Sequence, residues 1–140
     1  MREIDLLRGY PESNSRRFVH ADLRTIKNRI TASYRDNEFY DGSRNDGYGG
    51  FVYDGRWITV AKSMIEEYAL TEKSAILQVN CEKGFLLHDF KQLLPGIRVC
   101  GTEVSEYAIE TSMTSVRALP RLSWDCYARL ESRQGRCSQR

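Results

Sequence analysis

Residues 75–85 read AILQVNCEKGF, and this stretch decides the fold. Its first five residues form a short apolar run with β-branched members, which is typical of a buried strand. A polar loop follows, and from Gly84 to Leu94 the apolar residues return at helical spacing until Pro95-Gly96 ends the helix. The stretch therefore predicts a strand that leads directly into a helix.

The same order of elements repeats downstream. Residues 97–103 form a second short apolar run, and Ser105 is placed to cap a helix that continues to about Val116. Strand, helix, strand and helix at this spacing predict two parallel strands joined by a crossover helix. Parallel strands of this kind are covered on both faces, which fits the apolar runs.

Upstream of this unit, residues 58–70 have the apolar spacing of a helix. The same spacing between Phe18 and Phe39 predicts a longer amphipathic helix. Residues 41–50 hold four glycines and break regular structure between the two helices. This glycine-rich stretch is either a flexible connector or a lid that faces a ligand.

The chain divides by composition into three parts. Residues 1–45 comprise a polar lead and a helix, residues 46–117 form the α/β unit, and residues 118–140 form an irregular tail with five arginines and no lysine. The tail is either disordered or the aberrant end of a longer reading frame. We favour the second interpretation, because the pattern stops where a third strand should begin.

Charge and hydropathy exclude several classes of protein. Residues 1–117 carry 16 basic and 17 acidic side chains, so no basic footprint for nucleic acid covers the fold. No apolar run approaches the roughly 20 residues that span a bilayer, and the N-terminus does not resemble a secretory signal. We therefore expect a cytoplasmic protein that binds neither membrane nor nucleic acid.

The four cysteines do not have the spacing of a metal site. They are Cys81, Cys100, Cys126 and Cys137, and no pair has the gap of two to four residues found in zinc knuckles. We predict reduced, structural thiols and no bound metal.

Two segments reach the edge of the predicted sheet where parallel strands end, which is where ligands bind in such folds. They are residues 78–84 and residues 102–105. A carboxylate about 20 residues beyond the first turn can accept both hydroxyls of a ribose, and Glu103 follows Gly84 by 19 positions. The glycines of a dinucleotide fingerprint and the Gly-Lys-Ser/Thr of a phosphate loop are both absent from the sequence.

Three segments resemble class I S-adenosyl-L-methionine-dependent methyltransferases. Residues 76–85, ILQVNCEKGF, are similar to the first motif of that family, V-L-D-V-G-C-G/A-K-G-F. Residues 99–109, VCGTEVSEYAI, resemble its second motif, a strand that ends in an acid followed by I-S-x-x-A-I. Residues 47–57, GYGGFVYDGRW, are similar to the loop and helix that precede the first motif in one branch.

The resemblance covers about residues 40–112 and implies a partial Rossmann-like fold, with N-terminal helices before a short parallel βαβα unit. It implies that Glu103 binds the ribose and that Val104 and Ser105 border the adenine. It also implies that Arg56 binds the cofactor's carboxylate and that Tyr53 forms the roof of the pocket. The complete set of implied cofactor-binding residues is Gln78, Asn80, Cys81, Glu82, Gly84, Glu103, Val104, Ser105, Tyr53 and Arg56.

The first motif departs from the family pattern at three positions. Gln78 replaces an acid that would attract the cationic cofactor, although a polar strand-end residue bonded to backbone is the plainer interpretation. Asn80 replaces a glycine, and asparagine tolerates left-handed backbone better than other residues with a side chain. Glu82 replaces a small residue, and Lys83 beside it is expected to face solvent. We therefore expect weak or lost binding of S-adenosyl-L-methionine.

Two functions remain open at this stage. The chain is either an incomplete methyltransferase-family protein, weakly active or inactive, or a non-catalytic scaffold or binding module that keeps part of the fold. Neither a catalytic residue nor a methyl acceptor can be named, because the acceptor site in this class is built from later strands. A small sheet also leaves strand edges open, which makes self-association a further prediction.

Overall fold

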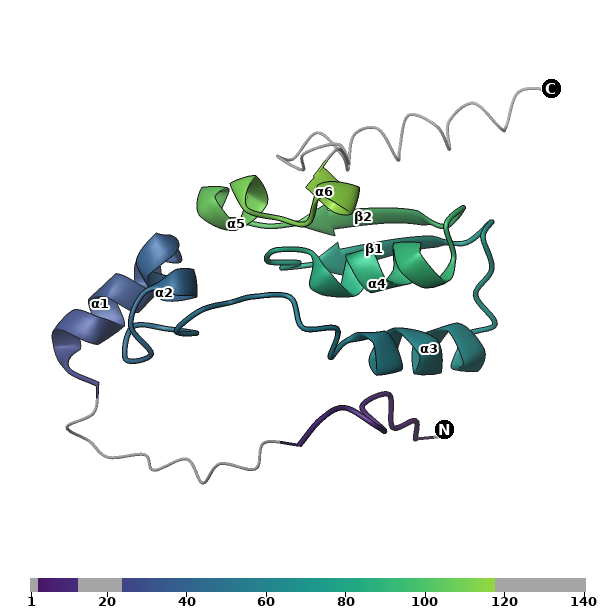
Figure 1. The fold of residues 1–140 in the computed structure, drawn as a ribbon, viewed down its shortest axis with the longest axis horizontal. Coiled ribbons are helices and arrows are strands. Elements are labelled where there is room, and N and C mark those ends of the chain that lie inside the picture. The colour runs from purple at the N-terminus through teal and green to yellow at the C-terminus, as the bar shows by residue number, and fades with distance from the viewer. Residues whose placement is uncertain (1–2, 13–23, 118–140) are drawn as a thin grey trace.

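The computed structural model describes residues 3–12 and 24–117 (Figure 1). These residues form an α/β structure with a two-stranded parallel sheet. The predicted tail, residues 118–140, lies outside the described residues. The elements in chain order are α1 (Ile26–Tyr34), α2 (Asn37–Asp41), α3 (Ile58–Glu67), β1 (Ala75–Val79), α4 (Phe85–Leu93), β2 (Arg98–Thr102), α5 (Glu106–Glu110) and α6 (Thr114–Arg117).

The sheet has the predicted strands in the predicted direction. β1 pairs with β2 in parallel, with Ala75 opposite Arg98 and Val79 opposite Thr102. The loop after β1 and the acid after β2 therefore lie at the same edge, the carboxyl edge of the sheet. The short apolar runs were sufficient to predict this arrangement, because β-branched runs of five to seven residues bounded by turns favour strands over helices.

An apolar core joins the sheet to the helices. α4 packs against β2, α3 packs on α4, and α6 contributes Val116. In Figure 1 α4 lies between the sheet and α3. The buried members of this core are Ala61, Leu87, Phe90, Ile97, Val99 and Val116.

One face of the sheet is open, which corrects the expectation that both faces are covered. Ile76 and Gln78 face α4, and the alternate residues of β1 point the other way. Leu77 is 44% exposed and Val79 is 69% exposed, because among the described residues no helix covers that face. The edge of β1 opposite β2 is also unpaired among the described residues, so the prediction of self-association stays open.

The prediction of a single N-terminal helix from Phe18 to Phe39 is wrong for the residues that the structure describes. Two short helices, α1 and α2, are separated by Arg35, whose φ of 51° ends α1 in the left-handed region. The apolar residues of α1 that suggested a buried stripe, Ile26, Ile30 and Tyr34, are all exposed. Residues 18–23 of the expected helix lie outside the described residues.

The last predicted helix is also divided. α5 ends at Glu110 with Thr111 as its C-cap, and the backbone N–H of Met113 then donates to the carbonyl of Lys83 at 3.0 Å. This bond turns the chain back over the loop after β1 before α6 begins. A helical period alone does not reveal such an interruption, because the competing bond is made to a residue 30 positions earlier.

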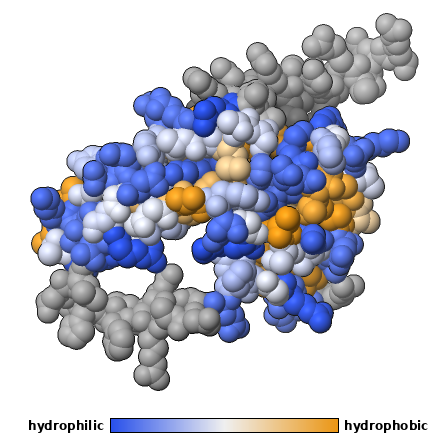
Figure 2. All heavy atoms as spheres, viewed as in Figure 1, coloured by the Kyte–Doolittle hydropathy of each residue, from blue (hydrophilic) through white to orange (hydrophobic). Residues whose placement is uncertain are grey.

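The surface is mixed in character. On the face shown in Figure 2, hydrophobic residues gather over α3 and α4, and the end formed by α1 and α2 is largely hydrophilic or neutral. Within residues 3–12 and 24–117, no helix combines the length and the apolar character needed to cross a membrane.

Candidate functional site

The loop after β1 has an unusual backbone. Asn80, Glu82 and Gly84 all have left-handed φ values, of 53°, 52° and 75°. The expectation that Asn80 tolerates this conformation is confirmed, whereas the same conformation at Glu82 was not predicted. At Gly84 a Cβ would lie 2.6 Å from Cγ2 of Val116, so the missing side chain makes room for α6.

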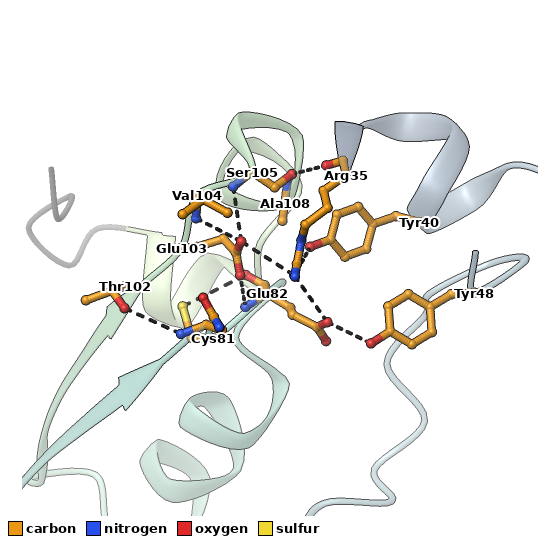
Figure 3. Close-up of polar contacts among 11 residues, drawn as sticks. Arg35, Tyr40, Tyr48, Cys81, Glu82, Thr102, Glu103, Val104, Ser105 and Ala108 are labelled. Atoms are coloured by element: carbon orange, nitrogen blue, oxygen red, sulfur yellow. Dashed lines mark hydrogen bonds and ion pairs between the residues drawn. The ribbon is translucent and has the colours of Figure 1, made fainter. Parts of the chain in front are cut away.

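Glu103 is the centre of the carboxyl edge (Figure 3). Its Oε2 accepts the backbone N–H of Glu82 at 2.7 Å, which ties the end of β2 to the loop after β1. Its Oε1 accepts the N–H groups of Val104 at 2.8 Å and Ser105 at 3.0 Å. The side chain is only 1% exposed. The carboxylate is therefore fixed in position by three backbone donors.

Arg35 covers this carboxylate, and sequence reasoning did not identify it. Its Nη2 lies 3.7 Å from Oε1 of Glu103 and 3.6 Å from Oε1 of Glu82, and it donates to the hydroxyl of Tyr40 at 3.2 Å. Its Nε is buried without a hydrogen-bond partner among the described residues. Arg35 thus closes the carboxyl edge with a guanidinium that is only partly satisfied (Figure 3).

Ser105 and Val104 border this closed edge in different ways. The Ser105 hydroxyl accepts the N–H of Ala108 at 3.1 Å, so it caps α5 as predicted, and it also donates to the carbonyl of Arg35. Val104 is 76% exposed. The two residues predicted to border an adenine are adjacent to Glu103, but the hydroxyl of Ser105 is already engaged by Arg35.

Glu82 connects the carboxyl edge to the glycine-rich stretch. Its Oε1 accepts the hydroxyl of Tyr48 at 2.7 Å. Burial, followed by this bond to a carboxylate, raises the pKa of Tyr48. The resemblance pointed to the backbone of Glu82, but its side chain is what holds the stretch from Gly47 to Gly50 against the loop.

Gln78 and Cys81 are held inside the fold. Oε1 of Gln78 is buried and has no hydrogen-bond partner among the described residues, so the expected bond to backbone is not formed by this atom. The N–H of Cys81 donates to the carbonyl of Thr102 at 2.9 Å. Burial, with the nearby Glu103 carboxylate, raises the pKa of the Cys81 thiol to about 11. A thiol of this kind is unreactive at neutral pH, which agrees with a structural role.

Lys83 is buried, which corrects the expectation that it faces solvent. Its Nζ donates to both carboxylate oxygens of Asp41, at 3.0 and 2.8 Å. It also lies 5.7 Å from the ring centre of Tyr40 and 5.5 Å from that of Tyr107. The ammonium is retained in the interior because a carboxylate and two aromatic faces replace its water.

Tyr53 and Arg56 do not contact the Glu103 site. The Tyr53 hydroxyl donates to Oδ1 of the buried Asp89 on α4, and burial together with this bond raises the pKa of Tyr53 to about 12. Nε of Arg56 donates to both carboxylate oxygens of Asp54, at 2.9 and 2.7 Å. In the described structure, Tyr53 and Arg56 are therefore bonded to Asp89 and Asp54 and do not lie at the predicted cofactor site.

A cavity of about 620 Å³ lies beside the loop, and Glu82 and Arg56 are among its lining residues. Sequence reasoning missed it because its rings come from four separate parts of the chain. These rings belong to Tyr10, Phe39, Tyr48, Phe51, Trp57 and Phe85.

Comparisons with known proteins found no matching family model, no similar curated protein and no similar solved structure.

Proposed function

We propose that the carboxyl edge of the sheet is a binding site for S-adenosyl-L-methionine, in a partial Rossmann-like unit of the methyltransferase type. The observation that carries the proposal is the direct bond between Glu103 and the loop after β1. It brings a strand-end acid and a left-handed loop together at the edge where nucleoside ligands bind in parallel sheets. The resemblance in residues 76–85 and 99–109 supports the same ligand.

The residues fit the cofactor in part. Glu103 is a strand-end acid that would accept ribose hydroxyls, and the exposed Val104 beside it would border the adenine. The cofactor carries its methyl group on a positively charged sulfonium. Gln78 replaces the acid of the family motif, so no carboxylate at this position attracts that charge. Arg35 must also move before a ribose can reach Glu103, because its guanidinium lies 3.7 Å from that carboxylate. Both features predict weak affinity.

Calorimetric titration with S-adenosyl-L-methionine tests this proposal. We expect a dissociation constant in the high-micromolar range, or about −5 to −7 kcal/mol. Glu103→Gln should weaken binding by about 1–3 kcal/mol, because charge-assisted bonds to the ribose are lost. Glu106→Gln, a change at the start of α5, is the matched control and should leave the affinity unchanged. Equal affinities of all three proteins would remove Glu103 from the site.

A restored loop provides a second test that does not depend on the stability of the Glu103 variant. The double change Gln78→Asp and Asn80→Gly should strengthen binding. The new carboxylate attracts a cation, by on the order of 1 kcal/mol once desolvation is deducted. The glycine removes left-handed strain of about 1 kcal/mol at a φ of 53°. No gain in affinity would show that this loop is not a cofactor site.

A non-catalytic scaffold is the second candidate, and one observation favours it. Glu103 already accepts three backbone N–H groups and lies beside Arg35, so its carboxylate has a complete structural role without a ligand. On this alternative Glu103→Gln lowers the free energy of unfolding, and S-adenosyl-L-methionine produces no heat with the parent protein. The same titration therefore separates the two candidates.

A further inference from the structure

The aromatic cavity beside the loop has two walls. On one side, the rings of Tyr48, Phe51 and Phe85 are stacked in series, with centroid distances of 4.3 and 4.8 Å and interplanar angles of 25° and 27°. A second pair of lining rings is Tyr10 and Trp57, whose centroids are 5.0 Å apart. Tyr48 is fixed through its hydroxyl bond to Glu82. Because the stacked rings cover one another's faces, they present fixed ring edges, and the face of a planar aromatic ligand can pack against these edges.

The charges around the cavity are unequal. Its two acids are both engaged, since Asp54 is paired with Arg56 and Glu82 accepts Tyr48 and lies 3.6 Å from Arg35.

The two remaining basic residues of the lining have no acidic partner within the part of the chain that the structure describes. Arg44 uses Nη1 to bond the carbonyls of Gly47 at 3.3 Å and Tyr48 at 2.5 Å. Among the described residues, Arg24 donates to the carbonyl of Arg44, at 3.5 Å. Neither contact neutralises a guanidinium, and carbonyl bonds leave other N–H groups of each side chain available. The described lining residues therefore include three arginines and two acids.

We infer that this cavity binds a planar aromatic anion, a ring system that bears one carboxylate, sulfonate or phosphate group. The ring lies against the wall of stacked aromatics, and the acid group meets Arg24 and Arg44 through charge-assisted bonds. A cation would also be attracted to aromatic faces, but two unneutralised guanidinium groups disfavour it. A volume of about 620 Å³ is within the range of small-molecule sites and accommodates two fused rings. This inference goes beyond the proposed function, since it needs no S-adenosyl-L-methionine.

Three probes of similar size separate the contributions of ring and charge. We would titrate the full chain calorimetrically with 2-naphthoate, with 2-naphthylmethylammonium and with the saturated analogue decahydro-2-naphthoate, each without S-adenosyl-L-methionine. The expected result is that naphthoate binds at least about tenfold more tightly than either of the others, since only it combines a planar ring with an anion. Equal or tighter binding of the ammonium probe would overturn the inference, as would absence of naphthoate binding.

Matched variants locate the site. Arg24→Gln should weaken naphthoate binding about fivefold or more through loss of a charge-assisted contact, while Arg29→Gln on α1 should not change it. Trp57→Leu should weaken binding to a similar extent, and Tyr68→Leu, which removes an exposed ring outside the cavity, should not. Equal effects within either pair would place the probe elsewhere and overturn the inference. If naphthoate fails to bind while S-adenosyl-L-methionine binds, only the inference fails and the proposed function stands.

Discussion

Two regions of the molecule are held together by different forces. The central unit, residues 58–117, has an apolar core around Phe90 and Leu87. The covering segment, residues 24–57, is attached to it through the ring contacts Tyr40–Tyr107 and Phe51–Phe85 and through the ion pair Asp41–Lys83. The comparison shows that a fold can combine a region specified by apolar periodicity with one that depends on a few individual polar pairs.

Phe90→Ala should lower the free energy of unfolding more than any other change proposed for the two regions. Phe90 is fully buried in the core cluster, and a Phe-to-Ala change in a core costs about 3–5 kcal/mol. Because the covering segment packs on the loop and on α5 of the central unit, both regions should unfold together. Urea unfolding followed by far-UV and near-UV circular dichroism measures this. Tyr68→Ala at an exposed position is the control, and a covering segment that survives in Phe90→Ala would contradict the account.

Lys83→Met should have a smaller and more local effect. It leaves Asp41 without its ammonium and removes two cation–aromatic contacts, at a cost of about 2–4 kcal/mol for a partly buried pair. Hydrogen exchange should increase in α1 and α2, and β1 and β2 should keep their protection.

The matched control is Lys62→Met on the exposed side of α3, which should change neither region. Uniform loss of protection in Lys83→Met would show that the two regions are one cooperative unit.

The stability of the two regions should also change with pH in opposite directions. Burial alone would raise the pKa of Asp41, but hydrogen bonds from Lys83, Tyr107 and the backbone of Phe51 outweigh it and hold the pKa below its ordinary value. The contribution of Asp41 is therefore present above the ordinary carboxyl range and is lost as the pH falls through its lowered folded-state pKa. The covering segment should loosen in acid.

Asp89 in the central unit has the opposite shift. Burial raises its pKa, and the bond from Tyr53 offsets only part of that effect. Its contribution is fully present below the ordinary carboxyl pKa and is lost as the pH rises through its raised folded-state value.

Urea unfolding between pH 3 and 7 measures this contribution. The parent protein should gain stability from Asp89 as the pH falls, and Asp89→Asn should lack that gain. Asp41→Asn should remove a loss in hydrogen-exchange protection of α1 and α2. Unchanged pH profiles in both variants would contradict these assignments.

The sequence predicted the central unit because its signals are local. β1 was expected at its observed bounds, and the left-handed backbone at Asn80 follows from a residue type that tolerates it. The covering segment was predicted poorly, since Arg35 interrupts the apolar period and is bonded to residues about 50 to 70 positions away. Partners at such separation leave no periodic signal in a single sequence. The same reason explains why Lys83 was expected in solvent.

The candidate site shows the same division. The position of Glu103 after β2 could be predicted, because it depends only on where a strand ends. Its closure by Arg35, and the unpaired Oε1 of Gln78, could not be predicted because both depend on three-dimensional packing.

The central claim is that the carboxyl edge is a cofactor site that Arg35 closes, and one titration tests it most directly. The affinity of S-adenosyl-L-methionine would be measured calorimetrically for the parent chain, for Arg35→Ala and for the control Arg29→Ala. Removing Arg35 frees the Glu103 carboxylate and takes a like charge away from a cationic ligand, so Arg35→Ala should bind several-fold more tightly than the parent, by about 1 kcal/mol. Arg29→Ala should match the parent. Absence of binding to all three proteins at millimolar ligand, or weaker binding to Arg35→Ala than to the parent, would contradict the claim.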